Sequence, residues 1–142
     1  MTSVNPLPPL LEHQIEIRVR YQETDAQGRV HHTNYFNYFE MGRIELLRAS
    51  GYLYRDLEAA GILLVVTDLR CKYHLPADFD DLLTLTTETT RCRGVRIDHQ
   101  YTLRRNQDLI AQAHSTVACI GRDGKIRRLP DWMTDAFHPK DV

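Results

Sequence analysis

Apolar and polar side chains alternate from His13 to Tyr21, and several of the apolar ones are β-branched. A period of two residues with such side chains is typical of a half-buried strand. The alternation is broken across residues 23–30, where Asp25 and Gly28 indicate a turn. We therefore expect the chain to form a strand that leads into a tight loop.

The next pattern is helical and covers Asn34 to Ser50, with Thr33 or Asn34 as the cap and Gly51 as the terminating residue. Apolar residues recur at helical spacing, and further apolar residues widen this side beyond a surface stripe. The pattern predicts a helix that is buried over most of its circumference.

After a short helix expected at Tyr52–Ala60 and closed by Gly61, the remaining chain has the pattern of β structure. The expected strands are Ile62–Leu75, Leu82–Cys92, Val95–Arg104 and Leu109–Ile120. Turn residues at 106–108 and 122–124 suit an antiparallel meander. One strand, one helix and four long strands predict an α+β domain in which a curved antiparallel sheet wraps around the helix. A dimer would cover the face or edge that such a sheet leaves open.

Composition fits this picture. The 142 residues allow one domain, expected over residues 13–135 between tails at 1–12 and 136–142. The chain is 42% hydrophobic and 26% charged, which is typical of a globular protein. No apolar run approaches the roughly 20 residues of a membrane helix. The first residues lack the basic segment of a secretory signal. Three cysteines without metal-pair spacing indicate reduced thiols, and we expect a cytoplasmic protein.

The formal net charge of −1 argues against nucleic-acid binding. The charge is unevenly distributed, however. Residues 1–90 carry 8 basic and 13 acidic side chains, whereas residues 91–142 carry 10 basic and 6 acidic ones. The last third of the chain can therefore hold a local anion site.

Asp25 is the first candidate for chemistry. It lies on the predicted loop, directly before the helix, whose first amides (around residues 32–35) have no partners inside the helix. A carboxylate facing such amides can hydrolyse an acyl bond, because the amides stabilise an oxyanion while the carboxylate activates water or attacks. An aspartate in a turn can also serve only as a local hydrogen-bond acceptor.

The segment from Tyr21 to Glu40 resembles the signature of hot-dog-fold acyl-CoA thioesterases of the 4-hydroxybenzoyl-CoA thioesterase type. The matching residues are Tyr21, Thr24-Asp25, Gly28, His31-His32, Asn34-Tyr35, Phe39-Glu40 and Arg43, and the resemblance extends over about residues 14–134. It implies a hot-dog domain with about five strands around one central helix. It also implies hydrolysis of an acyl-CoA thioester to a carboxylic acid and free coenzyme A.

By the same resemblance, Asp25 is the nucleophile or general base, and the backbone amide of His32 is the oxyanion donor. Tyr35 belongs to an aromatic group expected in the core, some of which can line an acyl pocket. The family implies a homodimer or homotetramer with active sites at the subunit interface. It implies neither a metal nor an organic cofactor, since coenzyme A is part of the substrate.

Arg91, Arg93 and Arg96 flank Gly94 at a junction between strands, and the equivalent region of the family contacts the phosphates of coenzyme A. Arginine offers forked donors that suit phosphate. The alternative is a solvated turn. A second basic group, Arg122, Lys125, Arg127 and Arg128, is expected on an exposed hairpin.

Two details depart from the family pattern. Arg29 stands where a small or apolar residue is usual, so its side chain either points outward or narrows the site. Val95-Arg96 replaces a stretch that commonly contains serine, which affects the expected contacts to coenzyme A.

Several alternatives to a thioesterase remain. His31-His32 can suggest a metal site, but adjacent histidines in an extended segment point in different directions. Glu40 occupies the helix position of the catalytic acid in another hot-dog branch, yet with Arg43 it forms an i,i+3 pair that suits an ion pair. A hot-dog hydratase or dehydratase and a non-catalytic acyl-CoA-binding protein are the remaining functions. The sequence leaves the acyl group open.

Overall fold

The structure is a computed structural model that describes residues 11–135. The tail expected at 136–142, and most of the one expected at 1–12, lie outside the described residues. Within these residues, three α-helices, one short 3-10 helix and five strands follow the order β1 (Glu12–Arg18), η1 (Tyr21–Glu23), α1 (Asn34–Ala49), α2 (Tyr54–Ala59), β2 (Leu63–Tyr73), β3 (Leu82–Arg93), β4 (Arg96–Arg105), β5 (Asp108–Ile120) and α3 (Asp131–Thr134). None of the described helices is long and apolar enough to cross a membrane.

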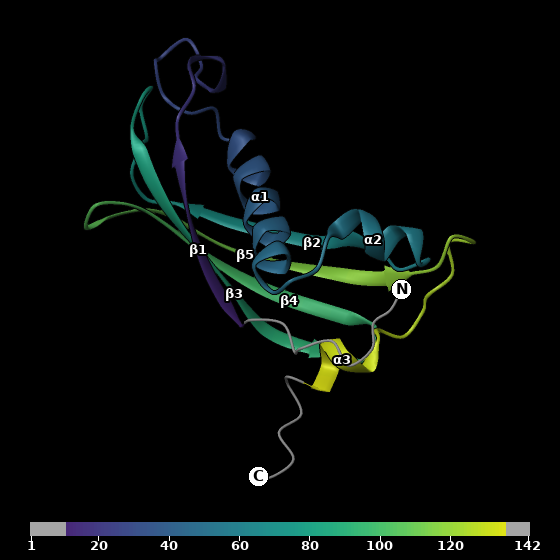
Figure 1. The fold of residues 1–142 in the computed structure, drawn as a ribbon. Coiled ribbons are helices and arrows are strands. Elements are labelled where there is room, and N and C mark those ends of the chain that lie inside the picture. Colours follow the sequence, from purple (N-terminus) through teal and green to yellow (C-terminus); the bar gives the residue numbers. More distant parts are fainter. Residues whose placement is uncertain (1–10, 136–142) are drawn as a thin grey trace.

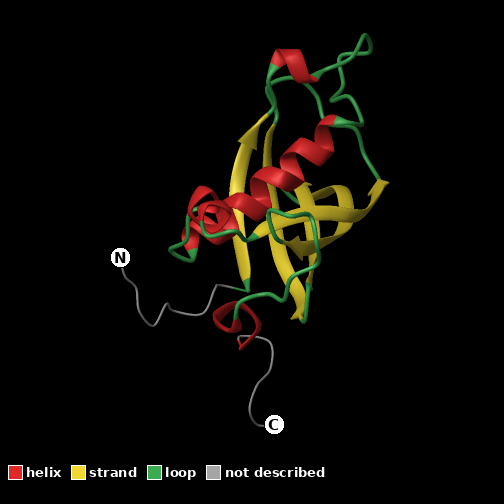
Figure 2. Ribbon diagram, turned by 90° about the vertical axis from the view of Figure 1, so that its right-hand side faces the viewer, coloured by secondary structure: helices red, strands yellow, loops and turns green. Residues whose placement is uncertain are grey.

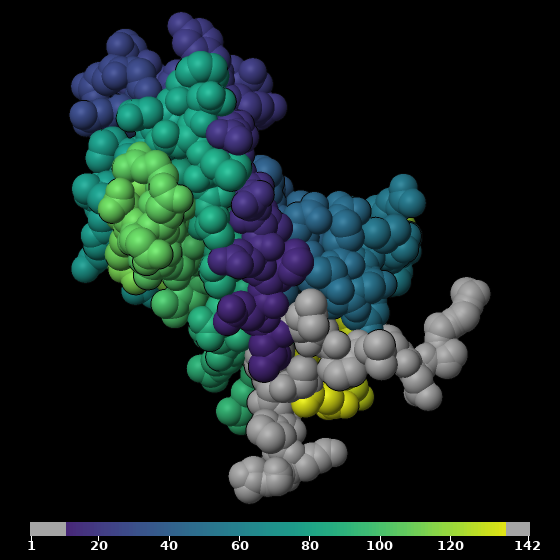
Figure 3. All heavy atoms as spheres, turned by 60° about the vertical axis from the view of Figure 1, so that its left-hand side comes forward, coloured from purple at the N-terminus to yellow at the C-terminus, as the bar shows by residue number. Residues whose placement is uncertain are grey.

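The strands form one antiparallel sheet in the order β1-β3-β4-β5-β2, so β1 and β2 are its edges. Helix α1 lies across one face of this curved sheet, as Figures 1 and 2 show. Figure 3 shows β1 in purple along the surface beside β3, with the helices beyond it. The predicted architecture of five strands and one central helix is confirmed.

The element boundaries differ from the prediction at a few places. β1 ends at Arg18 instead of Tyr21, because Val19 bonds to Asp80 and Asp81 beyond the strand and residues 21–23 form a 3-10 turn. The sequence pattern did not predict α3, which is only four residues long.

Helix α1 is buried on one side only. Tyr38 and Phe39 are completely buried against the sheet, while Phe36 and Met41 on the other side are 38% and 43% exposed. The expectation of burial over most of its circumference is therefore wrong for the single chain, because the sheet covers a single face of the helix.

The core has two parts. One lies under the first half of α1 and includes Tyr38, Phe39 and Leu85, and the other lies under α2 and α3 and includes Leu57, Val117 and Met133. Two of the three cysteines are buried, and all three are free thiols, as expected.

Candidate functional site

Asp25 lies on a small hairpin between β1 and α1. Its base is the bond from the His31 amide to the Glu23 carbonyl, at 2.9 Å, and the Asp25 amide donates to the Arg29 carbonyl at 2.8 Å. Gly28 closes the turn with φ +80°, which glycine adopts without strain. The predicted turn is confirmed.

Hydrogen bonds from the hairpin backbone fix one oxygen of the Asp25 carboxylate. Oδ1 accepts hydrogen bonds from the amides of Gln27, at 2.8 Å, and Arg29, at 3.4 Å. Within residues 11–135, Oδ2 accepts none, and Asp25 is half-buried. The exposed Arg29 side chain forms no ion pair with Asp25 in this part of the chain. One carboxylate oxygen is therefore available to water or to an acyl group.

The start of α1 supplies an open amide. The Asn34 amide bonds to the His31 carbonyl at 2.9 Å, and the Thr33 amide donates to His31 Nδ1 at 3.2 Å. The His32 amide has no hydrogen-bond partner among the described residues. An unpaired N–H beside a helix start attracts negative charge.

Thr33 is the N-cap residue of α1, one of the two predicted, but its side chain makes no capping hydrogen bond. The Thr33 hydroxyl bonds to His31 Nδ1 at 2.8 Å, and the Asn34 amide group donates to the Glu23 carbonyl at 2.8 Å. Both side chains bind the loop that precedes the helix instead of capping the helix. They fix the orientation of the segment that carries His32.

The rings of His31 and His32 stack with centroids 4.3 Å apart. The two side chains therefore do not point in different directions as predicted, because the chain turns into the helix here and is not extended. No group of three or more His, Cys, Asp or Glu side chains suited to a metal ion occurs in the part of the chain that the structure describes.

Sequence reasoning missed Glu23. Glu23 is 8% exposed, and its carboxylate accepts hydrogen bonds from the Arg20 amide at 2.9 Å, the Arg20 guanidinium at 3.1 Å and the Tyr38 hydroxyl at 2.8 Å. Burial alone would raise the pKa of Glu23, but these donors outweigh it and lower the pKa. Burial and the Glu23 carboxylate raise the pKa of Tyr38, which stays a donor. In the sequence, the one signal for Glu23 is its position directly before Thr24-Asp25.

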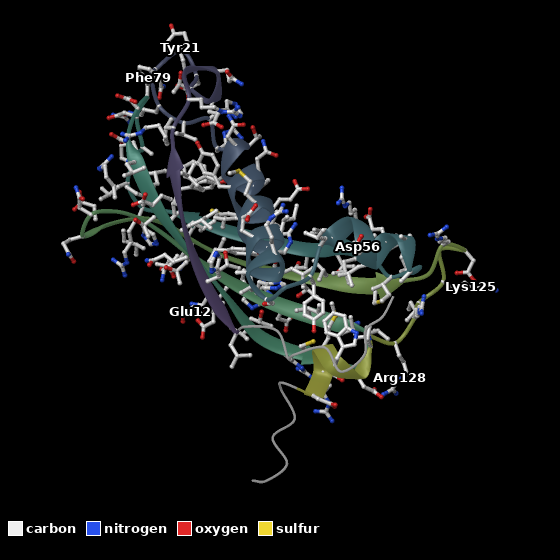
Figure 4. The ribbon with its side chains drawn as sticks, viewed as in Figure 1. Glu12, Tyr21, Asp56, Phe79, Lys125 and Arg128 are labelled. Atoms are coloured by element: carbon white, nitrogen blue, oxygen red, sulfur yellow. The ribbon has the colours of Figure 1, made fainter. Side chains whose placement is uncertain are left out.

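Aromatic side chains surround the hairpin. Tyr35 is 4% exposed and packs edge-on against Tyr73 with centroids 5.1 Å apart, so it lies in the core beside the site. The Tyr73 hydroxyl donates to the His32 carbonyl at 3.0 Å. Tyr21 and Phe79 form an exposed edge-on pair at this end of the molecule, as Figure 4 shows. Substrate contact by Tyr35 stays a prediction.

Arg91, Arg93 and Arg96 are exposed at the far end of β3. The Asp25 hairpin lies at the opposite end of β3, where the strand begins, since the backbone of Arg29 forms a β-bridge with Asp78 just before the strand. A strand of 12 residues spans roughly 35–40 Å. One chain therefore does not bring Asp25 and these arginines together.

The second basic group contacts α2. Arg122 donates to the carbonyls of Glu58, at 3.1 Å, and Ala59, at 2.7 Å, and Arg127 donates to that of Gly61 at 2.7 Å. Cationic groups suit a helix C-terminus. Figure 4 shows Lys125 and Arg128 at the opposite end of the molecule from Tyr21.

A cavity of about 70 Å³ lies between the second half of α1 and the sheet. Apolar residues including Leu46, Leu64 and Val117 line it, together with Arg43 and His99. The predicted ion pair of Glu40 and Arg43 is wrong: Glu40 is exposed, no ion pair joins the two within residues 11–135, and Arg43 Nη1 donates to the Tyr101 hydroxyl at 2.9 Å.

Known proteins show what the chain is similar to. The family model described as "Thioesterase-like superfamily" matches residues 19–137. An acyl-CoA thioesterase, YbgC, of Haemophilus influenzae is 35% identical over 125 residues, covering 86% of this chain and 91% of the relative. The acyl-CoA thioester hydrolase YbgC of Escherichia coli is 33% identical over 105 residues, covering 73% and 78%. The crystal structure of a DHNA-CoA thioesterase from Staphylococcus aureus has a TM-score of 0.82 at 28% identity, covering 91% and 87%.

Proposed function

This chain belongs to the thioesterase-like superfamily, has the hot-dog fold and hydrolyses acyl-CoA thioesters, and we propose that Asp25 is its catalytic carboxylate. The observation that carries the proposal is the Asp25 hairpin itself. It holds the carboxylate by Oδ1, leaves Oδ2 open and continues directly to the unpaired His32 amide.

The proposed chemistry needs only these two groups and water. Asp25 either removes a proton from a water molecule, whose oxygen then adds to the thioester carbonyl carbon, or adds to that carbon itself. In both cases the carbonyl oxygen becomes an oxyanion that the His32 amide stabilises. Cleavage of the C–S bond then releases coenzyme A as the thiol after protonation. The other product is a carboxylic acid, formed at once or after hydrolysis of an acyl-aspartate.

The decisive experiment is Asp25→Asn. We expect kcat for a good acyl-CoA substrate to fall by about 10²–10⁴-fold, because the amide can neither accept the proton nor attack. Released thiol is the readout, and an unchanged unfolding curve shows that the fold is intact. A variant within a few-fold of wild type would contradict the proposal. A wild-type protein that binds acyl-CoA without releasing thiol would be a binding protein instead.

The two roles of Asp25 differ in the intermediate they form. A covalent mechanism passes through an acyl group attached to Asp25, which adds the acyl mass to the protein. Mass spectrometry of a single turnover stopped by acid detects that adduct on Asp25. General-base catalysis leaves the protein mass unchanged at every time point.

We propose a homodimer that pairs the two β2 edges. β2 is an edge strand of 11 residues that exposes Val66 and Tyr73, at 47% and 45%, beside the charged Asp68, Arg70 and Lys72. The other edge strand, β1, has only seven residues and exposes Glu12 and Glu16. A long edge with exposed apolar side chains invites pairing, whereas a short charged one does not. In an antiparallel pair, the end of one β2 lies beside the start of the other.

Pairing of the two β2 strands would explain why Asp25 lies far from Arg91, Arg93 and Arg96 within one chain. The end of β2 carries Tyr73, which bonds to His32, while its start lines the cavity with Arg43. Each Asp25 site would then face the partner's cavity and the partner's Arg91, Arg93 and Arg96. We propose that these arginines bind the phosphates of coenzyme A.

Neither a metal nor an organic cofactor takes part in the proposed reaction. Dialysis against EDTA is therefore expected to leave kcat unchanged, and a loss restored by a divalent cation would overturn this part of the proposal. The three free thiols agree with the reducing cytoplasm as the site of action.

A further inference from the structure

The cavity under the second half of α1 contains a cationic side chain, Arg43, that forms no ion pair among the described residues. Arg43 offers five N–H donors, of which Nη1 donates to the Tyr101 hydroxyl at 2.9 Å. No carboxylate of the described residues lies within ion-pair distance of Arg43. A half-buried guanidinium that lacks a counterion makes the cavity attractive to an anion.

A second polar group in the cavity has no partner. His99 is 7% exposed and lines the cavity, and its Nδ1 forms no hydrogen bond within the described chain. Burial, Arg43 and His114 lower the pKa of His99 to about 3, so its ring is neutral and can donate from one nitrogen or accept at the other. A buried polar atom without a partner is costly unless a ligand satisfies it.

The rest of the cavity is apolar and small. Leu46, Leu64, Ile97 and Val117 are among its walls, and its volume is about 70 Å³. Since one water-sized atom occupies about 10–15 Å³ of such a volume, the cavity holds roughly five to seven non-hydrogen atoms. A carboxylate with two to four methylene groups has that size and that combination of charge and apolar surface.

From this cavity we infer the substrate class: acyl groups whose far end is a carboxylate, which Arg43 and His99 bind while the methylene groups contact the apolar walls. The inference rests on the proposed function, in which the partner's Asp25 acts on the thioester carbonyl at the other end of the acyl group, as general base or as nucleophile. Hydrolysis would give a dicarboxylic acid and free coenzyme A.

The test compares adipyl-CoA with heptanoyl-CoA, two substrates of similar length that differ in the terminal carboxylate. We expect wild-type kcat/KM to favour adipyl-CoA, and Arg43→Met to lower this preference by roughly 30-fold or more, the loss expected when one partner of a buried charge pair is removed. Arg43→Lys should restore part of it. The matched control is Arg48→Met on the same helix, because Arg48 is exposed and pairs with Glu45 outside the cavity.

The outcomes distinguish a failure of the proposed function from a failure of the inferred substrate class. If Asp25→Asn leaves thiol release unchanged, the proposed function fails. If hydrolysis depends on Asp25 but the wild type does not prefer adipyl-CoA, or Arg43→Met keeps the preference, the substrate class is overturned. Inhibition by free adipate without a preference for adipyl-CoA would make the cavity a product site and would also overturn it. Unchanged size-exclusion and unfolding profiles show that each variant is folded and assembled.

Discussion

At the scale of single residues, Glu23 holds the Asp25 hairpin to helix α1. Its carboxylate binds the buried Tyr38 hydroxyl of α1, while its carbonyl accepts bonds from the His31 amide and the Asn34 side chain. The same residue therefore fixes both ends of the segment that contains Asp25 and His32. We regard Glu23 as a positioning residue, because it acts through these neighbours.

Glu23→Ala is expected to weaken both stability and catalysis. It leaves the fully buried Tyr38 hydroxyl without its acceptor, which costs about 1–3 kcal/mol of unfolding free energy. Urea unfolding measures this loss, and kcat should fall with KM changed less because the hairpin loses its anchor. Glu23→Gln keeps an acceptor oxygen and should recover part of both. Glu16→Ala, at an exposed glutamate of β1, is the control. Wild-type kcat in Glu23→Ala would show that Asp25 is positioned without it.

His99 predicts a pH dependence of stability. Its pKa falls to about 3 in the folded chain because of burial, Arg43 and His114, whereas an unfolded histidine has a pKa of about 6.5. Below about pH 6.5 the unfolded chain therefore binds a proton that the folded chain does not, so stability is lost as the pH falls. We expect His99→Gln to reduce this slope by up to about 1.4 kcal/mol per pH unit between pH 6 and 4. His74→Gln, at an exposed histidine, should keep the wild-type slope. Parallel curves for wild type and His99→Gln would exclude a buried neutral His99.

Asp25 and Gly28 could be found in the sequence because a turn is encoded by neighbouring residues. The role of Glu23 could not, since it depends on Tyr38, 15 positions further along the chain. The ion pair that the sequence predicts between Glu40 and Arg43 fails for the same reason. The actual partner of Arg43, Tyr101, is 58 positions away on β4 and becomes a neighbour only in the folded sheet.

At the scale of elements, Gly42 sets the distance between α1 and the sheet. A Cβ at this position would overlap the Thr87 hydroxyl and lie 2.8 Å from Leu85 Cδ2, both on β3. The Thr87 hydroxyl is buried and has no hydrogen bond within the described residues. The helix therefore touches β3 directly where a larger residue would hold it away.

Gly42→Ala is expected to lower the unfolding free energy by about 1–3 kcal/mol, since overpacking forces the helix and strand apart. Thr87→Ala removes the hydroxyl that a Cβ at position 42 would overlap, and since this hydroxyl has no partner among the described residues, its loss breaks no hydrogen bond. The double variant should therefore be more stable than the sum of the two single changes predicts. Denaturant unfolding of the four proteins measures this coupling. Strict additivity would mean that the helix does not press on Thr87.

Most elements could be predicted within a few residues, because the period of apolar positions distinguishes a helix from a strand. The pattern cannot show where pairing stops. The irregular register of β2 between Val66 and Asp68 leaves no mark in the alternation, and the four-residue α3 is shorter than a period can reveal. The sequence does not predict the one-sided burial of α1. A broad apolar face indicates that a helix is covered, but it does not show whether the same chain or a second chain covers it.

At the scale of the whole molecule, the strand order separates the parts of the site. β1 pairs with β3 although 63 residues lie between Arg18 and Leu82, and this pairing puts Asp25 at one end of β3 with the arginines at the other. No local pattern predicts such a long-range pairing. The residues that the family resemblance implies for catalysis and for binding coenzyme A lie at opposite ends of β3 in the single chain.

Mixed dimers can test whether the site is shared between two chains. A dimer of one Asp25→Asn chain and one Arg43→Met chain, isolated with two different tags, has one site in which Asp25 and the cavity are both intact if each Asp25 faces the partner's cavity. The other site of that dimer carries both changes. By the twofold symmetry of the pair, we expect about half of the wild-type kcat/KM for adipyl-CoA, well above the mean of the two parent variants. If Asp25 instead uses the cavity of its own chain, the mixed dimer has no intact site, and its activity equals the mean of the parents. The Asp25→Asn chain paired with Arg48→Met is the control, and it should give about half of the wild-type value under either arrangement.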